Sequence, residues 1–188
     1  EVMDANTLNL IGRAKHGIPT DAAATLLVEL DADDAGIDLR AQAERMTEIC
    51  RRYRLTSDPV IAFDPEQRAE LWKARKALYP TLYRFDPRKK PINFVDDVVV
   101  PAERISELIR YLEEFFVGQH VPVAIFGHIG NGNAHIIPLL DVNDQGDFQK
   151  MVQGYHEIHQ TVLGRFGGSI CGEHGDGRVR AEYVKTMF

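Results

Sequence analysis

Residues 121–140 read VPVAIFGHIGNGNAHIIPLL, and this segment predicts the central hairpin of the fold. Two apolar runs, residues 121–126 and 134–140, flank a glycine-rich connection that contains Asn131-Gly132, a dipeptide typical of tight β-hairpins. If these two residues form the turn, His128 lies opposite His135, with β-carbons about 4.5–5.5 Å apart on one sheet face. The hairpin therefore predicts two imidazoles that can converge on one ion. A structural turn with two hydrogen-bonded histidines is the alternative.

Strands and helices alternate around this hairpin. We expect further strands at residues 25–30, 60–63, 98–100 and 169–171, and helices at residues 37–53, 64–80, 103–116 and 148–166. Residues 86–91, DPRKKP, predict an exposed loop, because two prolines and three cations do not fit a sheet interior. The pattern indicates an α+β fold as a single domain over residues 1–188. Its mixed, largely antiparallel sheet would have helices packed on one face, like a ferredoxin-like cap domain.

Composition narrows the classes of partner. The formal charge of −6, without a stripe of Lys and Arg, argues against nucleic acid, and an anionic substrate would need a local positive site. Only Cys50 and Cys171 are present, too few for a disulfide framework, and no apolar run reaches the roughly 20 residues that a membrane span needs. We expect a cytoplasmic protein without a transmembrane segment.

A second glycine-rich segment, residues 171–178, reads CGEHGDGR. Neighbouring residues in an extended stretch point to opposite sides, so Glu173 can join His128 and His135 in a metal site while His174 faces a substrate. Nitrogen and oxygen donors without thiolate suit zinc, manganese or iron(II). A glycine-rich turn with a solvated acidic residue is the alternative for this segment.

Together these segments resemble the C-terminal domain of FAD-linked oxidases related to D-lactate, glycolate and D-2-hydroxyglutarate dehydrogenases, within the vanillyl-alcohol-oxidase-like flavoenzymes. That family has a His-x-Gly-Asp-Gly-Asn-x-His stretch followed by Gly-Glu-His-Gly-x-Gly, and residues 128–135 and 172–177 match them in order. Residues 71–75, LWKAR, and 97–101, DVVVP, are similar to the family's Trp-x-x-Arg helix and to a strand that precedes its next helix.

The resemblance implies a role for each matching residue. His128, His135 and Glu173 match metal ligands, for Zn or Mn with Fe as a further option. His174 matches the catalytic histidine and Arg75 the arginine that holds the substrate carboxylate, and Asn133 is the expected contact to FAD. The implied reaction oxidises a D-2-hydroxy acid, D-lactate-like or D-2-hydroxyglutarate-like, to the 2-oxo acid. A flavin-binding domain or subunit and a downstream electron acceptor are the implied partners, and the full-length enzyme could lie peripherally at the inner face of the membrane.

Three departures bear on these roles. Asn131 stands where the family usually has Asp, and Ile137 replaces an expected polar residue, which favours a smaller, less polar substrate. The chain also lacks the flavin-binding domain, so we expect a fragment of a longer flavoenzyme that is inactive alone. Two alternatives remain open from the residues: a metal-dependent hydrolase or oxygenase with two histidines and one carboxylate, or a non-catalytic metal-binding docking domain.

Overall fold

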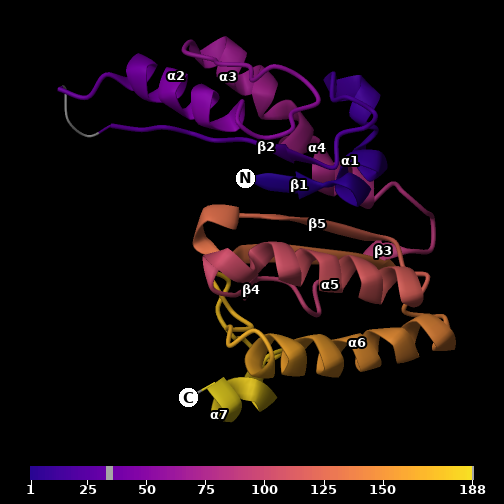
Figure 1. The fold of residues 1–188 in the computed structure, drawn as a ribbon. Helices are drawn as coiled ribbons and strands as arrows, with labels where there is room; N and C mark the ends of the chain where they lie inside the picture. Colours follow the sequence, from indigo (N-terminus) through magenta and orange to yellow (C-terminus); the bar gives the residue numbers. More distant parts are fainter. Residues whose placement is uncertain (33–35, 188) are drawn as a thin grey trace.

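The computed structural model describes residues 1–32 and 36–187, and it confirms an α+β fold (Figure 1). Within these residues the sheet has six strands in the order β2-β1-β5-β6-β3, and β4 also pairs with β6. Every described pair of strands is antiparallel. The predicted hairpin is the β5–β6 pair at the centre of this order.

The elements follow one another along the chain with these bounds. The strands are β1 (Val2–Asp4), β2 (Ala24–Leu26), β3 (Lys90–Pro91), β4 (Val98–Val99), β5 (Val123–Gly127) and β6 (Asn133–Leu140). The α-helices are α1 (Ala5–Ile11), α2 (Leu39–Cys50), α3 (Pro65–Leu71), α4 (Lys73–Leu82), α5 (Ile105–Gly118), α6 (Gln145–Gly164) and α7 (Val184–Met187). Short 3₁₀ helices occupy Arg13–His16, Ala102–Arg104, Ile129–Asn131 and Ala181–Tyr183.

Helices cover both faces of the sheet, whereas we expected them on one face. On β5, Val123 and Ile125 pack with residues of α5 and α6, while Ala124 and Phe126 pack with residues of α1 and α4. Successive residues of a strand point to opposite faces, so the two sets form separate apolar clusters. All eight residues of β6 are buried, as a strand covered on both faces requires. Figure 1 shows α5 and α6 on one side of the sheet and α1 and α4 on the other.

The N-terminal half departs most from the expected elements. The strand predicted at residues 25–30 is confirmed in part as β2, but residues 60–63 form no strand. Val60 is 74% exposed and Phe63 is 43% exposed, so this apolar run does not pack in the core of the sheet. The helix expected over residues 64–80 starts as predicted, with Asp64 as N-cap and a proline in its first turn, but it is divided at Trp72.

The remaining differences concern where elements begin and end. Pro80 lies inside α4, which stops two residues later. The expected loop at residues 86–91 contributes β3, a strand on the sheet edge where proline is tolerated. The strand expected at residues 169–171 is reduced to a single bridge between Ser169 and Val99. The helices predicted over residues 37–53, 103–116 and 148–166 are present as α2, α5 and α6.

Candidate metal and substrate site

The turn between β5 and β6 is longer than predicted, and this changes which residue faces His135. Phe126, not His128, is the partner of His135 across the hairpin, because the 3₁₀ helix Ile129–Asn131 lies between the strands. Gly132 ends that turn in the left-handed conformation, with φ 70°. The expected opposition was therefore wrong. The two imidazoles nevertheless lie close together, with ring centroids 5.5 Å apart.

Gly132 also lets a third segment approach the hairpin. Its carbonyl accepts the Val100 N–H at 2.9 Å, and a β-carbon at this position would lie 1.9 Å from the Val100 carbonyl oxygen. Only glycine fits this approach. The consequence is that β4, and the two acidic residues Asp96 and Asp97 that precede it, lie beside His135 and Asn133.

Asp97 anchors the second glycine-rich segment. Its Oδ2 accepts three consecutive backbone N–H groups, from Gly172 at 2.9 Å, Glu173 at 2.9 Å and His174 at 2.8 Å. Its Oδ1 accepts the Nδ2 group of Asn133 at 2.9 Å. Burial alone would raise the pKa of Asp97, but the backbone hydrogen bonds from His174, Glu173 and Gly172 outweigh it and hold the pKa below its usual range. This carboxylate therefore fixes the main chain of the segment that carries Glu173 and His174.

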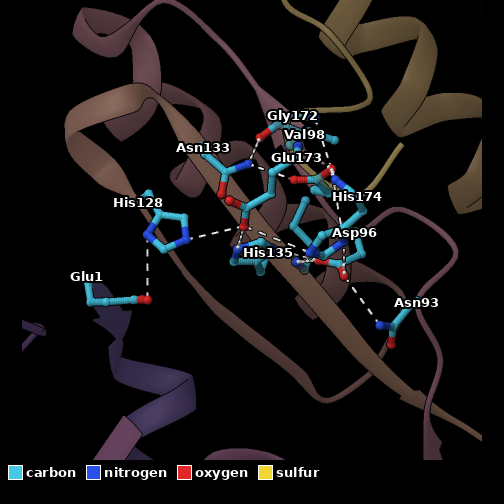
Figure 2. Close-up of polar contacts among 12 residues, drawn as sticks. Glu1, Asn93, Asp96, Val98, His128, Asn133, His135, Gly172, Glu173 and His174 are labelled. Atoms are coloured by element: carbon cyan, nitrogen blue, oxygen red, sulfur yellow. Dashed lines mark hydrogen bonds and ion pairs between the residues drawn. The ribbon is translucent and has the colours of Figure 1, made fainter. Parts of the chain in front are cut away.

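Glu173 Oε1 is the point on which the histidines converge (Figure 2). It lies 3.3 Å from His128 Nε2, 3.3 Å from His135 Nε2 and 3.9 Å from His174 Nε2. The carboxylate is about half exposed, while His135 is almost fully buried. One ligand atom each from Asp97, His135, Glu173 and His174 also lies within 4.8 Å of the others. The two oxygens of Asp97 already accept four hydrogen bonds, so Asp97 is a poor candidate ligand although it lies close to the other three residues.

The carboxylate of Asp96 lies close to two of these histidines, His135 and His174. Its Oδ1 lies 3.2 Å from His135 Nδ1, and its Oδ2 lies 3.4 Å from His174 Nδ1. Burial lowers the pKa of His135, but the hydrogen bond and negative charge of Asp96, with the charge of Glu173, outweigh it and raise the pKa above its ordinary value. We expected no role for Asp96 from the sequence. The available signal was an acidic pair placed directly before an apolar strand.

Arg75 lies next to the histidines without contacting them. Its Nε pairs with Glu1 Oε2 at 3.1 Å, and Glu1 Oε1 lies 3.6 Å from His128 Nδ1. The guanidinium stacks 4.3 Å above the ring of Phe126, the residue opposite His135. Across residues 1–32 and 36–187, no hydrogen bond or ion pair engages its two terminal nitrogens. These nitrogens remain able to bind an anion.

Asn133 is buried, and only one of its two side-chain polar atoms has a hydrogen-bond partner among the described residues. Its Nδ2 donates to Asp97, whereas its Oδ1 is a buried acceptor that has no partner among the described residues. A buried polar atom without a partner is uncommon and needs an explanation such as a ligand or water.

The profile of the family described as FAD linked oxidases, C-terminal domain, matches residues 1–188. The chain belongs to this family.

Three curated proteins show what this chain is similar to in sequence. The glycolate oxidase subunit GlcD of Bacillus subtilis (strain 168) is 29% identical over 189 residues, which cover 100% of this chain and 38% of the relative. A D-2-hydroxyglutarate dehydrogenase of Xanthomonas citri pv. viticola is 34% identical, over 85% of this chain and 33% of the relative. A D-lactate dehydrogenase of Anaerostipes hadrus is 30% identical, over 68% of this chain and 26% of the relative.

The chain spans little more than a third of the length of the glycolate oxidase subunits that it matches. The glycolate oxidase subunit, the D-2-hydroxyglutarate dehydrogenase and the D-lactate dehydrogenase carry different substrate names. In the part of the chain that the structure describes, no helix has both the length and the apolar character needed to cross a membrane.

Proposed function

We propose that this chain is the substrate- and metal-binding domain of a longer FAD-dependent dehydrogenase that oxidises a D-2-hydroxy acid to the 2-oxo acid. The observation that carries the proposal is the convergence of His128 and His135 on Glu173 Oε1, each at 3.3 Å, with His174 beside it. Membership in the FAD linked oxidase family supports oxidation over the hydrolase and docking-domain alternatives.

The donor set fits a divalent metal ion. Two imidazole nitrogens and one carboxylate oxygen, without thiolate, suit Zn²⁺, Mn²⁺ or Fe²⁺. His128, His135 and Glu173 would hold the ion, and the half-exposed Glu173 leaves one side of the cluster open to a substrate. When bound, such an ion supplies Lewis acidity to a coordinated hydroxyl group.

His174 is the proposed general base. Its Nε2 faces the same carboxylate as the two proposed ligands, and the ring is partly exposed, so a substrate hydroxyl held at the cluster would lie within its reach. His174 would accept the hydroxyl proton, and a well-placed base contributes about 10²–10⁴ in rate. When bound, FAD would supply the hydride acceptor for this oxidation.

Arg75 and Asn133 are the proposed contacts to substrate and cofactor. The free terminal nitrogens of Arg75 can form two parallel hydrogen bonds with a carboxylate, and Glu1 would hold the guanidinium in place through Nε. The unpartnered Oδ1 of Asn133 can accept a hydrogen bond from FAD. Ile137 gives no help in choosing the substrate, because it is fully buried in the apolar cluster with α1 and α4.

A metal titration tests this proposal directly. The metal-stripped chain is titrated with Zn²⁺ and Mn²⁺ by calorimetry, alongside His128→Ala, Glu173→Ala and the control His16→Ala, which removes a histidine from the 3₁₀ helix Arg13–His16. We expect one tight site per chain, retained in the control and lost in both site variants. No tight site in the intact chain, or a site that survives Glu173→Ala, would refute the metal assignment.

Activity tests the reaction class. A protein that joins this chain to its flavin-binding part is assayed with D-lactate, glycolate and D-2-hydroxyglutarate and an artificial electron acceptor. We expect flavin-dependent oxidation of one of them, abolished by His174→Ala. Turnover without flavin would favour the hydrolase or oxygenase alternative.

A further inference from the structure

Asp96 is a buried carboxylate that contacts both the proposed metal ligand His135 and the proposed base His174. It lies directly before β4 and is 1% exposed. Figure 2 shows it beside His135 and His174. Its Oδ1 lies 3.2 Å from His135 Nδ1, and its Oδ2 lies 3.4 Å from His174 Nδ1, so each oxygen faces one ring.

The carboxylate itself is held in place by groups outside the site. The Ile136 N–H donates to Oδ1 at 3.3 Å, and Asn93 Nδ2 donates to Oδ2 at 3.3 Å. The Arg180 guanidinium donates to the Asp96 backbone carbonyl. The two imidazole rings are stacked, with centroids 5.1 Å apart and planes 16° apart. One buried carboxylate therefore hydrogen-bonds Nδ1 of His135 and lies at ion-pair distance from Nδ1 of His174, the equivalent atom of a nearly parallel ring.

A carboxylate that faces Nδ1 decides which nitrogen of a neutral imidazole carries the hydrogen. An ionised carboxylate only accepts hydrogen bonds, so in a neutral ring the nitrogen that bonds to it is the donor and the other nitrogen carries the lone pair. For His135 the contact with hydrogen-bond geometry is that of Nδ1 with the buried Asp96, whereas Nε2 lies at ion-pair distance from the half-exposed Glu173. In both rings, Nε2 is the atom that faces Glu173 Oε1, at 3.3 Å for His135 and 3.9 Å for His174.

We propose that Asp96 is a positioning residue that fixes His135 and His174 together as Nδ1–H tautomers, so that both Nε2 lone pairs point toward the same place beside Glu173. This inference rests on the proposed function, because it gives the ligand role to one ring and the base role to the other. Asp96 thereby keeps a lone pair on Nε2 of the proposed ligand His135 and on Nε2 of the proposed base His174.

The neighbouring residues do not share this role. Asp97 lies 4.0 Å from His174 Nδ1, and its Oδ2 is already engaged by three backbone N–H groups. His128 has no contact with Asp96, and its Nδ1 faces Glu1 at 3.6 Å. His128 is therefore an internal reference for any effect that reaches histidines only through Asp96.

Tautomers can be measured by two-bond ¹H–¹⁵N spectra of the metal-free 188-residue chain with ¹⁵N-labelled histidine, at an alkaline pH where the imidazoles are neutral. We expect Nδ1–H signatures for His135 and His174. In Asp96→Asn, the amide N–H₂ group would donate to one of the two Nδ1 atoms, so at least one of these rings should become Nε2–H while His128 is unchanged. An Nε2–H signature for either ring in the unmodified chain would overturn the proposal, as would unaltered tautomers in the variant.

Controls separate this result from loss of fold and from failure of the proposed function. Asp147→Asn changes another buried aspartate, which pairs with Lys89 and Lys150 and contacts none of the site histidines, and it should leave all three signatures unchanged. If Asp96→Asn does not fold, the spectrum of the unmodified chain still decides. Zn²⁺ affinity in Asp96→Asn should fall about 10–100-fold, as for other residues that orient a metal-binding histidine. Nδ1–H signatures without any metal binding would support the role of Asp96 and count against the metal site alone.

Discussion

The carboxylate of Asp97 accepts the backbone N–H of Glu173 at 2.9 Å, so a residue that precedes β4 fixes a proposed ligand 76 positions later in the chain. The same oxygen accepts the N–H groups on either side of Glu173. Nothing in the residues around Glu173 supplies these bonds. The segment from residue 172 to residue 174 therefore depends on Asp97 for its conformation.

Replacement of Asp97 by Asn should damage this segment while keeping the size of the side chain. Either orientation of the amide places its N–H₂ group against a donor, the three backbone N–H groups or the Asn133 amide. We expect a loss of about 2–3 kcal/mol in the free energy of unfolding, measured by urea denaturation, since bonds to charged groups contribute about 1.5–3 kcal/mol.

Asp86→Asn is the matched control for this change. Asp86 also accepts two backbone N–H groups, from Arg88 and Lys89, but in an exposed turn. It should unfold near the urea concentration of the unmodified chain. Equal effects of the two substitutions would contradict the anchoring role of Asp97.

Gly132 and Gly130 form a matched pair that tests the approach of β4 to the hairpin. A β-carbon on Gly132 would lie 1.9 Å from the Val100 carbonyl oxygen, and its φ of 70° is strained for other residues, whereas nothing lies within 4 Å of a β-carbon on Gly130. Gly132→Ala should lower the free energy of unfolding by about 3 kcal/mol or more. Gly130→Ala should have little effect on the melting temperature in the same calorimetric experiment. Similar melting temperatures for both variants would refute the close approach.

Arg75→Ala should weaken substrate binding without preventing folding. Loss of a charge-assisted pair with the substrate carboxylate is expected to lower kcat/KM about 10–100-fold in a flavin-containing protein, chiefly through KM. Arg75→Lys should recover only part of this loss, because lysine cannot form two parallel hydrogen bonds. Arg110→Ala removes an exposed arginine on α5 whose side chain, among residues 1–32 and 36–187, bonds only to the Ser106 carbonyl, and it should leave kcat/KM unchanged. An unaltered KM in Arg75→Ala would remove Arg75 from the substrate site.

His159 gives the chain a sensitivity to acid that is independent of the site. It is fully buried on α6, and neither ring nitrogen has a partner among the described residues. Burial, followed by the charges of Arg180 and His156, lowers its pKa from 6.5 to about 4. Between pH 6.5 and pH 4, the unfolded chain therefore binds a proton that the folded chain does not. The free energy of unfolding keeps its full value above pH 6.5 and falls by about 3 kcal/mol as the pH drops toward 4.

His159→Phe should remove this part of the pH dependence. Urea midpoints are compared at pH 7.5 and pH 5, and the difference between the two should be smaller in His159→Phe than in the unmodified chain. His16→Phe, at a partly exposed position, should keep the full difference. A pH dependence that persists unchanged in His159→Phe would show that other groups cause it.

Residue patterns along the chain specified the elements whose causes are local. The apolar stripe of α5, the Asp64 cap of α3 and the two apolar runs of the β5–β6 hairpin are all set by residues close together in the chain, and each was predicted. The two glycine-rich segments also indicated which residues would meet, since His128, His135, Glu173 and His174 do converge.

Contacts between distant segments hold these residues together. The register of the hairpin followed from a 3₁₀ turn, and the coverage of both sheet faces followed from the packing of α1 and α4. Asp96 and Asp97 gained their roles because β4 pairs with β6 beside Gly132, a contact between residues far apart in the chain. Local patterns specify helices, turns and strands, but they do not encode which carboxylate will lie beneath which imidazole, because that depends on the closest approach of distant backbones.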